Sequence, residues 1–393
     1  MSRPALPRAY WFVWAGTLIN RLGGFVVPLL AIYLVRARGL DAEQAGGIVA
    51  AFGAGQVVAS IAGGQLTDRL GRRATMLISL WGGAVAMLAL GRARGTLELT
   101  CGVAAVGFVG ELYRPAVAAL ISDVVAPAHR VYAFGALYWA VNLGWACAGA
   151  LGGLVADYDF SLLFYADAAT TFAFGVVVAL AVPETRPAPE PRATAGPAPA
   201  LLGDRAFLVF LAIHFASVLV FMQVLATLAI HMSWQGFAPS TYGVVVALNG
   251  VLICVLQPVL TPIAARRDPS RVLALAALLY GIAMFAHGLA PTALAHAGAV
   301  VIWTLAEILE SPTKSALVAA FAPTSARGRY QGAMVMTWGL GTMVGPKLGT
   351  WIWQHAGPHV LWTGCLVVGA IASALYLVTA RARRSRLGHA TPP

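Results

Sequence analysis

The stretch Gly64-Gln-Leu-Thr-Asp-Arg-Leu-Gly-Arg-Arg73 places four charged side chains between two apolar runs, residues 44–63 and 74–91. Because the hydrocarbon core of a bilayer is roughly 30 Å thick, a helix needs about 20 mostly apolar residues to cross it. Both runs have about that length. The stretch is therefore predicted as a polar loop at the membrane surface that joins two membrane-spanning helices.

The same alternation of apolar runs and polar loops recurs along all 393 residues, of which 59% are hydrophobic and only 10% are charged. Such a composition could hardly supply the polar surface of a water-soluble fold. We therefore expect an all-α membrane protein with twelve transmembrane helices. Their approximate ranges are 10–35, 44–63, 74–91, 97–122, 132–156, 161–182, 206–230, 240–263, 271–290, 294–321, 331–354 and 360–380.

A proline-rich polar segment, residues 183–205, divides these spans into six and six. Its composition predicts a flexible cytoplasmic linker rather than a helix in lipid. An internal repeat supports the division, because a shift of 196 residues places Glu111 on Glu307. The sequence thus predicts two pseudo-symmetric six-helix bundles, residues 1–182 and 206–393, the second ending in a short cytoplasmic tail.

The basic residues are distributed unevenly between the two sides of this predicted membrane protein. Eighteen of the 26 Lys and Arg residues lie at the chain ends or in alternate connections, whereas only Arg36, Arg38, Arg92 and Arg94 lie in the other connections. By the positive-inside rule, this asymmetry predicts a multi-pass protein with both termini cytoplasmic. It also explains the net charge of +11 without a nucleic-acid partner. The four cysteines are scattered and indicate neither disulfides nor a metal site.

Three motifs resemble those of the major facilitator superfamily of transporters. The stretch 64–73 fits the superfamily's signature loop at every defining position and lies in the expected connection. Residues 341–349, Gly-Thr-Met-Val-Gly-Pro-Lys-Leu-Gly, are similar to its glycine-proline antiporter pattern, here in the eleventh span. Residues 149–153 keep the glycines of that pattern in the fifth span but have Ala150 in place of proline. That departure weakens the inference to antiport.

Shorter matches resemble the twelve-helix drug:proton antiporter branch of the superfamily. They include Asn20-Arg21, Tyr113-Arg114, Gln223, Asn249-Gly250 and residues 304–312. The resemblance implies a major facilitator fold whose two halves alternate in opening a central site to either side of the membrane. It further implies that protons drive the transport of a small molecule.

The resemblance also implies roles for the signature loop and the glycine motifs. In the family a cytoplasmic charge cluster latches the two halves in the outward-facing state, and glycines allow the tight turn and close helix packing. The predicted gate comprises Gly64, Asp68, Arg69, Gly71, Arg72, Arg73 and Asp123. The predicted helix-packing residues are Gly149, Gly152, Gly153, Gly341, Gly345, Pro346 and Gly349.

Glu307, Glu310 and Lys314 lie in one otherwise apolar span. A charge at the centre of a membrane helix costs about 3 kcal/mol, so these side chains are expected to face the bundle interior or an aqueous cavity. Their spacing puts all three on one helix face, where Glu310 and Lys314 can pair directly. Glu307 lacks a local cation and is the preferred proton-coupling residue. Glu310 either shares that role or only forms a buried ion pair.

Glu111 and Arg114 are three residues apart in the fourth span and share a helix face. The resemblance associates an arginine on this helix with proton transfer, and Arg114 matches it. The alternative is a permanent salt bridge that keeps Glu111 ionised. Glu111 is therefore the second choice for proton coupling, after Glu307.

The predicted substrate cavity combines polar residues with aromatic rings, as in small-molecule sites generally. Arg21 and Lys347 would either balance buried carboxylates or bind an anionic part of the substrate. The predicted lining is Asn20, Arg21, Tyr113, Asn142, Gln223, Trp303, Lys314, Trp338 and Lys347.

These patterns predict a proton-coupled transporter of the inner membrane that exports a lipophilic small molecule or drug. We expect a monomer that uses the proton gradient and no cofactor. One alternative is a proton-coupled symporter that imports a peptide, sugar or organic anion. A membrane-embedded enzyme or sensor is more remote, because the sequence shows no nucleophile with its base, no metal ligands and no appended soluble domain.

Overall fold

The computed structural model describes residues 6–126, 129–186, 201–323 and 327–388, and the regular structure within them is helical. The helices are α1 (Arg8–Leu22), α2 (Val26–Ile32), η1 (Tyr33–Ala37), α3 (Ala42–Leu70), α4 (Arg72–Arg92), α5 (Thr96–Val109), α6 (Tyr113–Val124), α7 (Arg130–Tyr158), α8 (Ser161–Ala181), η3 (Leu201–Gly203), α9 (Arg205–Phe221), η4 (Met222–Val224), α10 (Thr227–Trp234), α11 (Pro239–Ala265), α12 (Pro269–Leu289), α13 (Ala293–Phe321), α14 (Arg327–His355), α15 (Pro358–Val378) and α16 (Ala380–Gly388).

These helices confirm the predicted all-α membrane fold. Among the described residues, eleven helical segments are long and apolar enough to cross a membrane. The eleventh predicted span corresponds to α14, which is not among these eleven segments. It has 29 residues but contains Gln331, Lys347 and several glycines. This helix packs against α3 and α9, so part of its surface faces protein rather than lipid.

Three of the predicted spans are interrupted. The first breaks at residues 23–25, which separate the end of α1 from the start of α2, and the seventh breaks at the 3₁₀ turn η4. The first predicted span of each half is thus interrupted. The fourth span breaks between α5 and α6, and Glu111 lies in that break. Its repeat counterpart Glu307 lies instead within the continuous helix α13.

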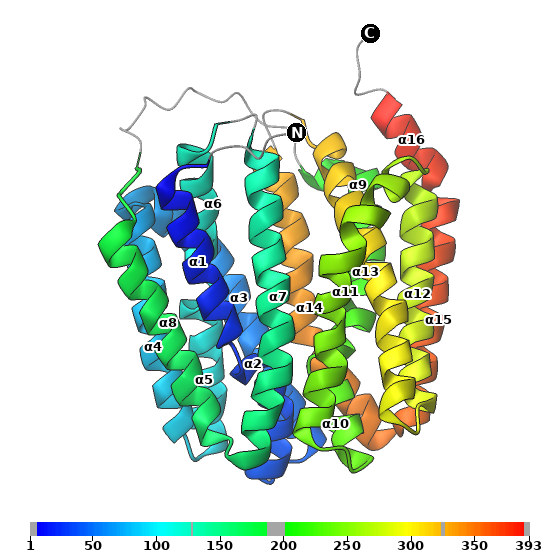
Figure 1. Ribbon diagram of the computed structural model, residues 1–393. Coiled ribbons are helices and arrows are strands. Elements are labelled where there is room, and N and C mark those ends of the chain that lie inside the picture. Colours follow the sequence, from blue (N-terminus) through cyan, green and yellow to red (C-terminus); the bar gives the residue numbers. More distant parts are fainter. Residues whose placement is uncertain (1–5, 127–128, 187–200, 324–326, 389–393) are drawn as a thin grey trace.

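The helices run side by side in two groups (Figure 1). We call residues 8–181 the N half and residues 201–388 the C half. Helix α3 packs against α14, and α7 packs against α11, so these four helices form the interface between the halves. The boundaries predicted at 183 and 205 stay a prediction, because most of the linker, residues 187–200, lies outside the described residues.

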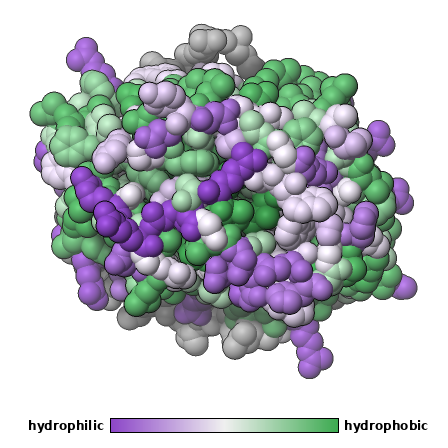
Figure 2. Space-filling model, turned by 90° about the horizontal axis from the view of Figure 1, so that it is seen from below, coloured by the Kyte–Doolittle hydropathy of each residue, from purple (hydrophilic) through white to green (hydrophobic). Residues whose placement is uncertain are grey.

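The beginning of α1 and the helix α16 lie at the same end of the molecule, drawn at the top of Figure 1. We call this the terminal end and the opposite one the distal end. Figure 2 views the distal end and shows hydrophilic side chains spread over its middle, with apolar side chains around much of the rim. This distribution fits a protein surrounded by lipid.

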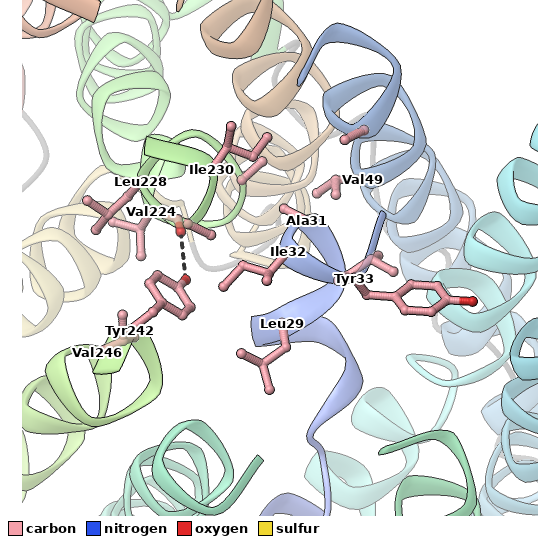
Figure 3. Close-up of a cluster of buried hydrophobic side chains, with 14 of the residues drawn as sticks. Leu29, Ala31, Ile32, Tyr33, Val49, Val224, Leu228, Ile230, Tyr242 and Val246 are labelled. Atoms are coloured by element: carbon pink, nitrogen blue, oxygen red, sulfur yellow. Dashed lines mark hydrogen bonds between the residues drawn. The ribbon is translucent and has the colours of Figure 1, made fainter. Parts of the chain in front are cut away.

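The buried apolar residues show that the halves meet at the distal end. One core cluster contains residues of both halves, whereas two other clusters near the terminal end each belong to a single half. Figure 3 shows part of the shared cluster, with Leu29 and Ile32 of α2 facing Leu228 and Val246 across the interface. The Tyr242 hydroxyl donates a hydrogen bond to the Val224 carbonyl at 3.2 Å there. We call this part of the cluster the distal seal; its labelled members are Leu29, Ala31, Ile32, Tyr33, Val49, Val224, Leu228, Ile230, Tyr242 and Val246.

Polar contacts between the halves reinforce the distal seal. Arg36 donates from Nε to the Ser233 hydroxyl at 2.7 Å and from Nη2 to the Phe237 carbonyl at 2.7 Å. Lys347 of α14 forms an ion pair with Glu43 of α3, with Nζ and Oε1 2.5 Å apart. The structure is therefore closed at the distal end.

Small residues allow the interface helices to approach closely. A Cβ atom on Gly153 would lie 2.7 Å from the Pro239 carbonyl oxygen, and one on Gly149 would lie 3.1 Å from that of Gly243. These two predicted packing glycines thus lie where α7 meets α11. The other predicted positions with close neighbours pack within one half: Gly152 on Phe25 and Leu29, Gly341 and Gly345 on Val218 and Met222, and Gly349 on Gln223.

We predict that Gly153→Ala destabilises the protein by about 1–3 kcal/mol, because the added methyl group meets the backbone of the α11 start, which cannot move aside easily. The matched control is Gly135→Ala on the same helix, where a Cβ would meet nothing within 4 Å. That control should be neutral or slightly stabilising. Thermal unfolding of the purified variants in detergent measures both effects, and equal unfolding temperatures would refute the proposed tight packing.

Candidate functional site

A cavity of about 400 Å³ lies between the two halves. This is within the size range of small-molecule sites. Its wall includes polar residues and aromatic rings of both halves, among them Asn142 of α7, Asn249 of α11, Phe221 of α9 and Trp338 of α14. The predicted residues Asn20, Arg21, Tyr113, Asn142, Trp303, Lys314 and Trp338 all line it.

Glu307 contributes a carboxylate to the C-half wall of this cavity. The Asn249 side chain donates from Nδ2 to Glu307 Oε2 at 3.0 Å and contacts the Thr304 hydroxyl oxygen at 3.1 Å. Among the described residues Glu307 forms no ion pair. Glu307 therefore has a neutral hydrogen-bond partner and access to the cavity.

Glu310 has a different environment one turn further along α13. Its Oε1 lies 2.9 Å from His214 Nδ1, and its Oε2 accepts a hydrogen bond from the Tyr280 hydroxyl at 3.2 Å. Lys314 Nζ lies 3.8 Å from the same Oε2, which is the pairing that the spacing predicted. The Lys314 ammonium also lies 5.7 Å from the centre of the Trp338 ring. Glu310 is thus held by three partners, two of which sequence spacing did not indicate.

In the N half, Glu111 and Arg114 form the ion pair that their spacing allows, with Nε and Oε2 3.0 Å apart. The Arg114 side chain is 52% exposed, so water weakens this pair. Arg21 donates from Nη2 to the Tyr113 hydroxyl at 2.9 Å and interacts electrostatically with Glu111. The structure therefore brings the predicted residues of spans one and four together on one wall of the cavity.

Asp167 of α8 is a cavity carboxylate that the sequence analysis missed. It is only 5% exposed. Its Oδ2 accepts from the Val26 backbone N–H, and its Oδ1 accepts from the Thr171 hydroxyl, each at 3.4 Å. It is the one acidic residue between Ser161 and Ala181. A lone carboxylate in an apolar span was the signal that could have revealed it.

Two residues of the predicted lining lie elsewhere. Gln223 is 4% exposed and donates from Nε2 to the carbonyls of Leu219 and Gly345, so its amide is engaged between α9 and α14. Lys347 lies toward the distal end, where it pairs with Glu43. Neither residue lines the cavity in this structure, in which the distal end is closed.

The histidines of the C half are mostly buried, and His287 Nδ1 lies 2.9 Å from His296 Nδ1. His296 Nε2 lies 2.9 Å from Gln235 Oε1. Within the described part of the chain, no group of three or more His, Cys, Asp or Glu residues is placed to hold a metal ion.

The comparisons with known proteins agree with this architecture. The family model described as Major Facilitator Superfamily matches residues 13–313 and 226–392. The chain belongs to the major facilitator superfamily. It is therefore a membrane transporter and not an enzyme.

Curated relatives and solved structures resemble this transporter over most of its length. The Na(+), Li(+), K(+)/H(+) antiporter of Planococcus maritimus is 26% identical over 82% of this chain and 84% of its own. Multidrug resistance protein MdtH of Klebsiella pneumoniae is 25% identical over 96% of this chain and 95% of its own. The crystal structure of a POT family transporter in complex with 5-aminolevulinic acid superposes with a TM-score of 0.81 at 14% identity, covering 96% and 97% of the two chains. That similarity shows the fold.

Two of the predicted gate residues of the transporter, Arg72 and Asp123, form an ion pair within the N half. Arg72 Nε lies 2.8 Å from Asp123 Oδ2, which also accepts from the Thr185 hydroxyl at 3.0 Å. Asp68 forms no ion pair in the part of the chain that the structure describes. A Cβ on Gly64 would meet nothing within 4 Å, whereas Gly71 adopts φ +99°, which favours glycine.

Glu184 contacts this group of residues, although it was not among the predicted gate residues. Its carboxylate accepts from the backbone N–H groups of Arg72 at 2.8 Å, Arg73 at 3.1 Å, Thr185 at 3.0 Å and Arg186 at 3.0 Å. Partial burial alone would raise the pKa of Glu184, but these donors favour the ionised form, and the pKa is lowered. Glu184 therefore ties the start of α4 to the end of α8 through backbone contacts that side-chain patterns do not reveal.

We predict that Glu310→Gln destabilises the transporter by about 3 kcal/mol, because it leaves Lys314 without its carboxylate in a mostly buried site. Glu307→Gln is the matched control on the same helix. Its amide oxygen can still accept from Asn249, so its effect should stay below about 1 kcal/mol. Thermal unfolding in detergent compares the two, and equal losses of stability would contradict the distinction between a carboxylate with a cationic partner and one without.

Proposed function

We propose that this transporter exchanges protons for a lipophilic small molecule, which it exports by alternating access. The observation that carries the proposal is the setting of Glu307. A carboxyl group that carries protons must reach water and must lack a permanent cationic partner. Glu307 lines the cavity and has Asn249 as its hydrogen-bond partner.

The aromatic side chains that line the cavity support a lipophilic substrate. The ring centroid of Phe221 lies 5.6 Å from that of Trp303 and 5.4 Å from that of Trp338. All three residues line the cavity. Such rings offer a large apolar surface to a ligand, and Glu307, which forms no ion pair among the described residues, favours positive charge on it. The multidrug resistance relative is consistent with this class of substrate.

The closed distal end supports alternating access. The halves share an apolar core at that end and keep separate cores at the other. By the distribution of arginines, the terminal end is cytoplasmic and the distal end faces the outside of the cell membrane. The structure then corresponds to the state that receives substrate from the cytoplasm.

One chain contains the whole cavity, so we propose that a monomer is the working unit. The proton gradient would supply the energy, with no cofactor. Protons and substrate would compete for the charged groups of the cavity. Each ligand can shift the equilibrium between the inward-facing and outward-facing states only by the difference between its affinities for them.

We predict that Glu307→Gln abolishes proton-driven transport. In everted membrane vesicles with an acidic lumen, addition of a fluorescent lipophilic cation should release protons from the lumen through the normal protein and not through the variant. The control is Glu98→Gln, which changes a carboxylate at the distal surface whose hydrogen bonds, among the described residues, come from the backbone N–H groups just before α5. This control should transport normally.

Two outcomes of the vesicle experiment would contradict the proposal. Unimpaired pH-dependent transport by Glu307→Gln would remove Glu307 from the coupling mechanism. Acidification of the lumen on substrate addition would show that substrate and protons move in the same direction, as in a symporter.

A further inference from the structure

The cavity holds four carboxylates: Glu111, Asp167, Glu307 and Glu310. Glu111 pairs with Arg114, and Glu310 pairs with Lys314 and His214. Within the described residues, Glu307 and Asp167 form no ion pair. The two halves therefore each contribute one cavity carboxylate that is unpaired, and in the N half it is Asp167 rather than the repeat counterpart Glu111.

The surroundings of Asp167 supply weak partners from several elements. Its own helix provides Thr171, whose hydroxyl also accepts from Asn20 Nδ2 of α1 at 2.7 Å. Helix α2 provides the Val26 N–H. The facing charge is Arg21 of α1, which interacts with Asp167 electrostatically but hydrogen-bonds to Tyr113. Helices α4 and α7 also pack against α8. Their charged residues lie near the helix ends: Arg72, Arg73, Arg92, Arg130 and Asp157.

The bond from Val26 links this carboxylate to the distal seal. Val26 is the first residue of α2, directly after the break at residues 23–25. Leu29 and Ile32 of the same short helix pack in the distal seal against the C half. An ionised carboxylate accepts a hydrogen bond from a backbone N–H more strongly than a neutral carboxyl does. Asp167 is thus placed to sense a proton at one end of α2 and to affect packing along it.

We propose that Asp167 is a second proton-carrying carboxyl and that its protonation loosens α2 from the distal seal. A hydronium ion in the cavity gives its proton to one oxygen of the Asp167 carboxylate, which leaves water and a neutral carboxyl group. The neutral group holds the Val26 N–H less firmly. This inference rests on the proton coupling proposed for Glu307 and adds a second site to it in the other half.

The test is infrared difference spectroscopy of the full-length transporter in lipid vesicles, titrated from mildly alkaline to mildly acidic pH. This range lies above the titration of ordinary surface carboxylates, whose pKa values are about 4. We expect two carboxylic C=O bands to appear as the pH falls. Asp167→Asn should lose one band and keep the other, which also shows that the variant is folded. Glu98→Gln should keep both.

A second variant addresses the case in which Asp167→Asn does not fold. Thr171→Val removes the hydroxyl that donates to Asp167 and should shift the Asp167 band alone, because Glu307 lies in the other half.

The possible outcomes distinguish the role proposed for Asp167 from the role proposed for Glu307. Retention of both bands in Asp167→Asn, or an unshifted spectrum in Thr171→Val, would overturn the role of Asp167 and show that it only anchors α2. Loss of one band in Asp167→Asn with no loss in Glu307→Gln would support Asp167 and remove Glu307 from proton coupling. The absence of any titrating band in the normal protein would overturn both.

Discussion

The cost of an unsolvated charge within a membrane governs the arrangement of this transporter. A carboxylate in the bundle needs either a partner that neutralises it or access to water, since hydrocarbon offers neither. The structure uses both solutions within one cavity. Glu310 contacts His214, Tyr280 and Lys314. Glu307 accepts a hydrogen bond from the neutral side chain of Asn249 and lines the cavity. The first environment favours a fixed charge, and the second allows the charge to change.

This difference connects chemistry to movement because the cavity lies between the halves. Interrupted helices bring the polar sites and the seal into contact: the break before Val26 exposes a backbone N–H to Asp167, and the rest of α2 packs between the halves. Backbone groups freed at such breaks are tolerated in membrane proteins where they face protein or water. A change of charge in the cavity thus reaches the distal seal through one short helix.

The sequence predicted the parts that depend on local spacing. Apolar runs of about 20 residues corresponded to spanning helices, and the i, i+4 and i, i+3 spacings gave the Glu310–Lys314 and Glu111–Arg114 pairs. Partners from distant helices could not be read in this way. His214 lies far from Glu310 in sequence, Glu43 pairs with Lys347 across the halves, and Glu184 reaches the gate through backbone N–H groups. Tertiary packing decides these contacts. Lys347 was predicted to line the cavity because it lies in a span, but in the structure it pairs with Glu43 instead.

The central claim is that protons in the cavity control the distal seal, and pulsed electron paramagnetic resonance tests it most directly. In a background with the four cysteines replaced by serine, spin labels at Leu97 and Leu294 report the separation of the halves at the distal end, where both side chains are exposed. Labels at Leu70 and Ile263 report the terminal end. In lipid nanodiscs, lower pH should add a longer distal distance to the unsubstituted protein, and Asp167→Asn should show that distance already at neutral pH. A distal distance distribution that is the same at every pH would contradict the account.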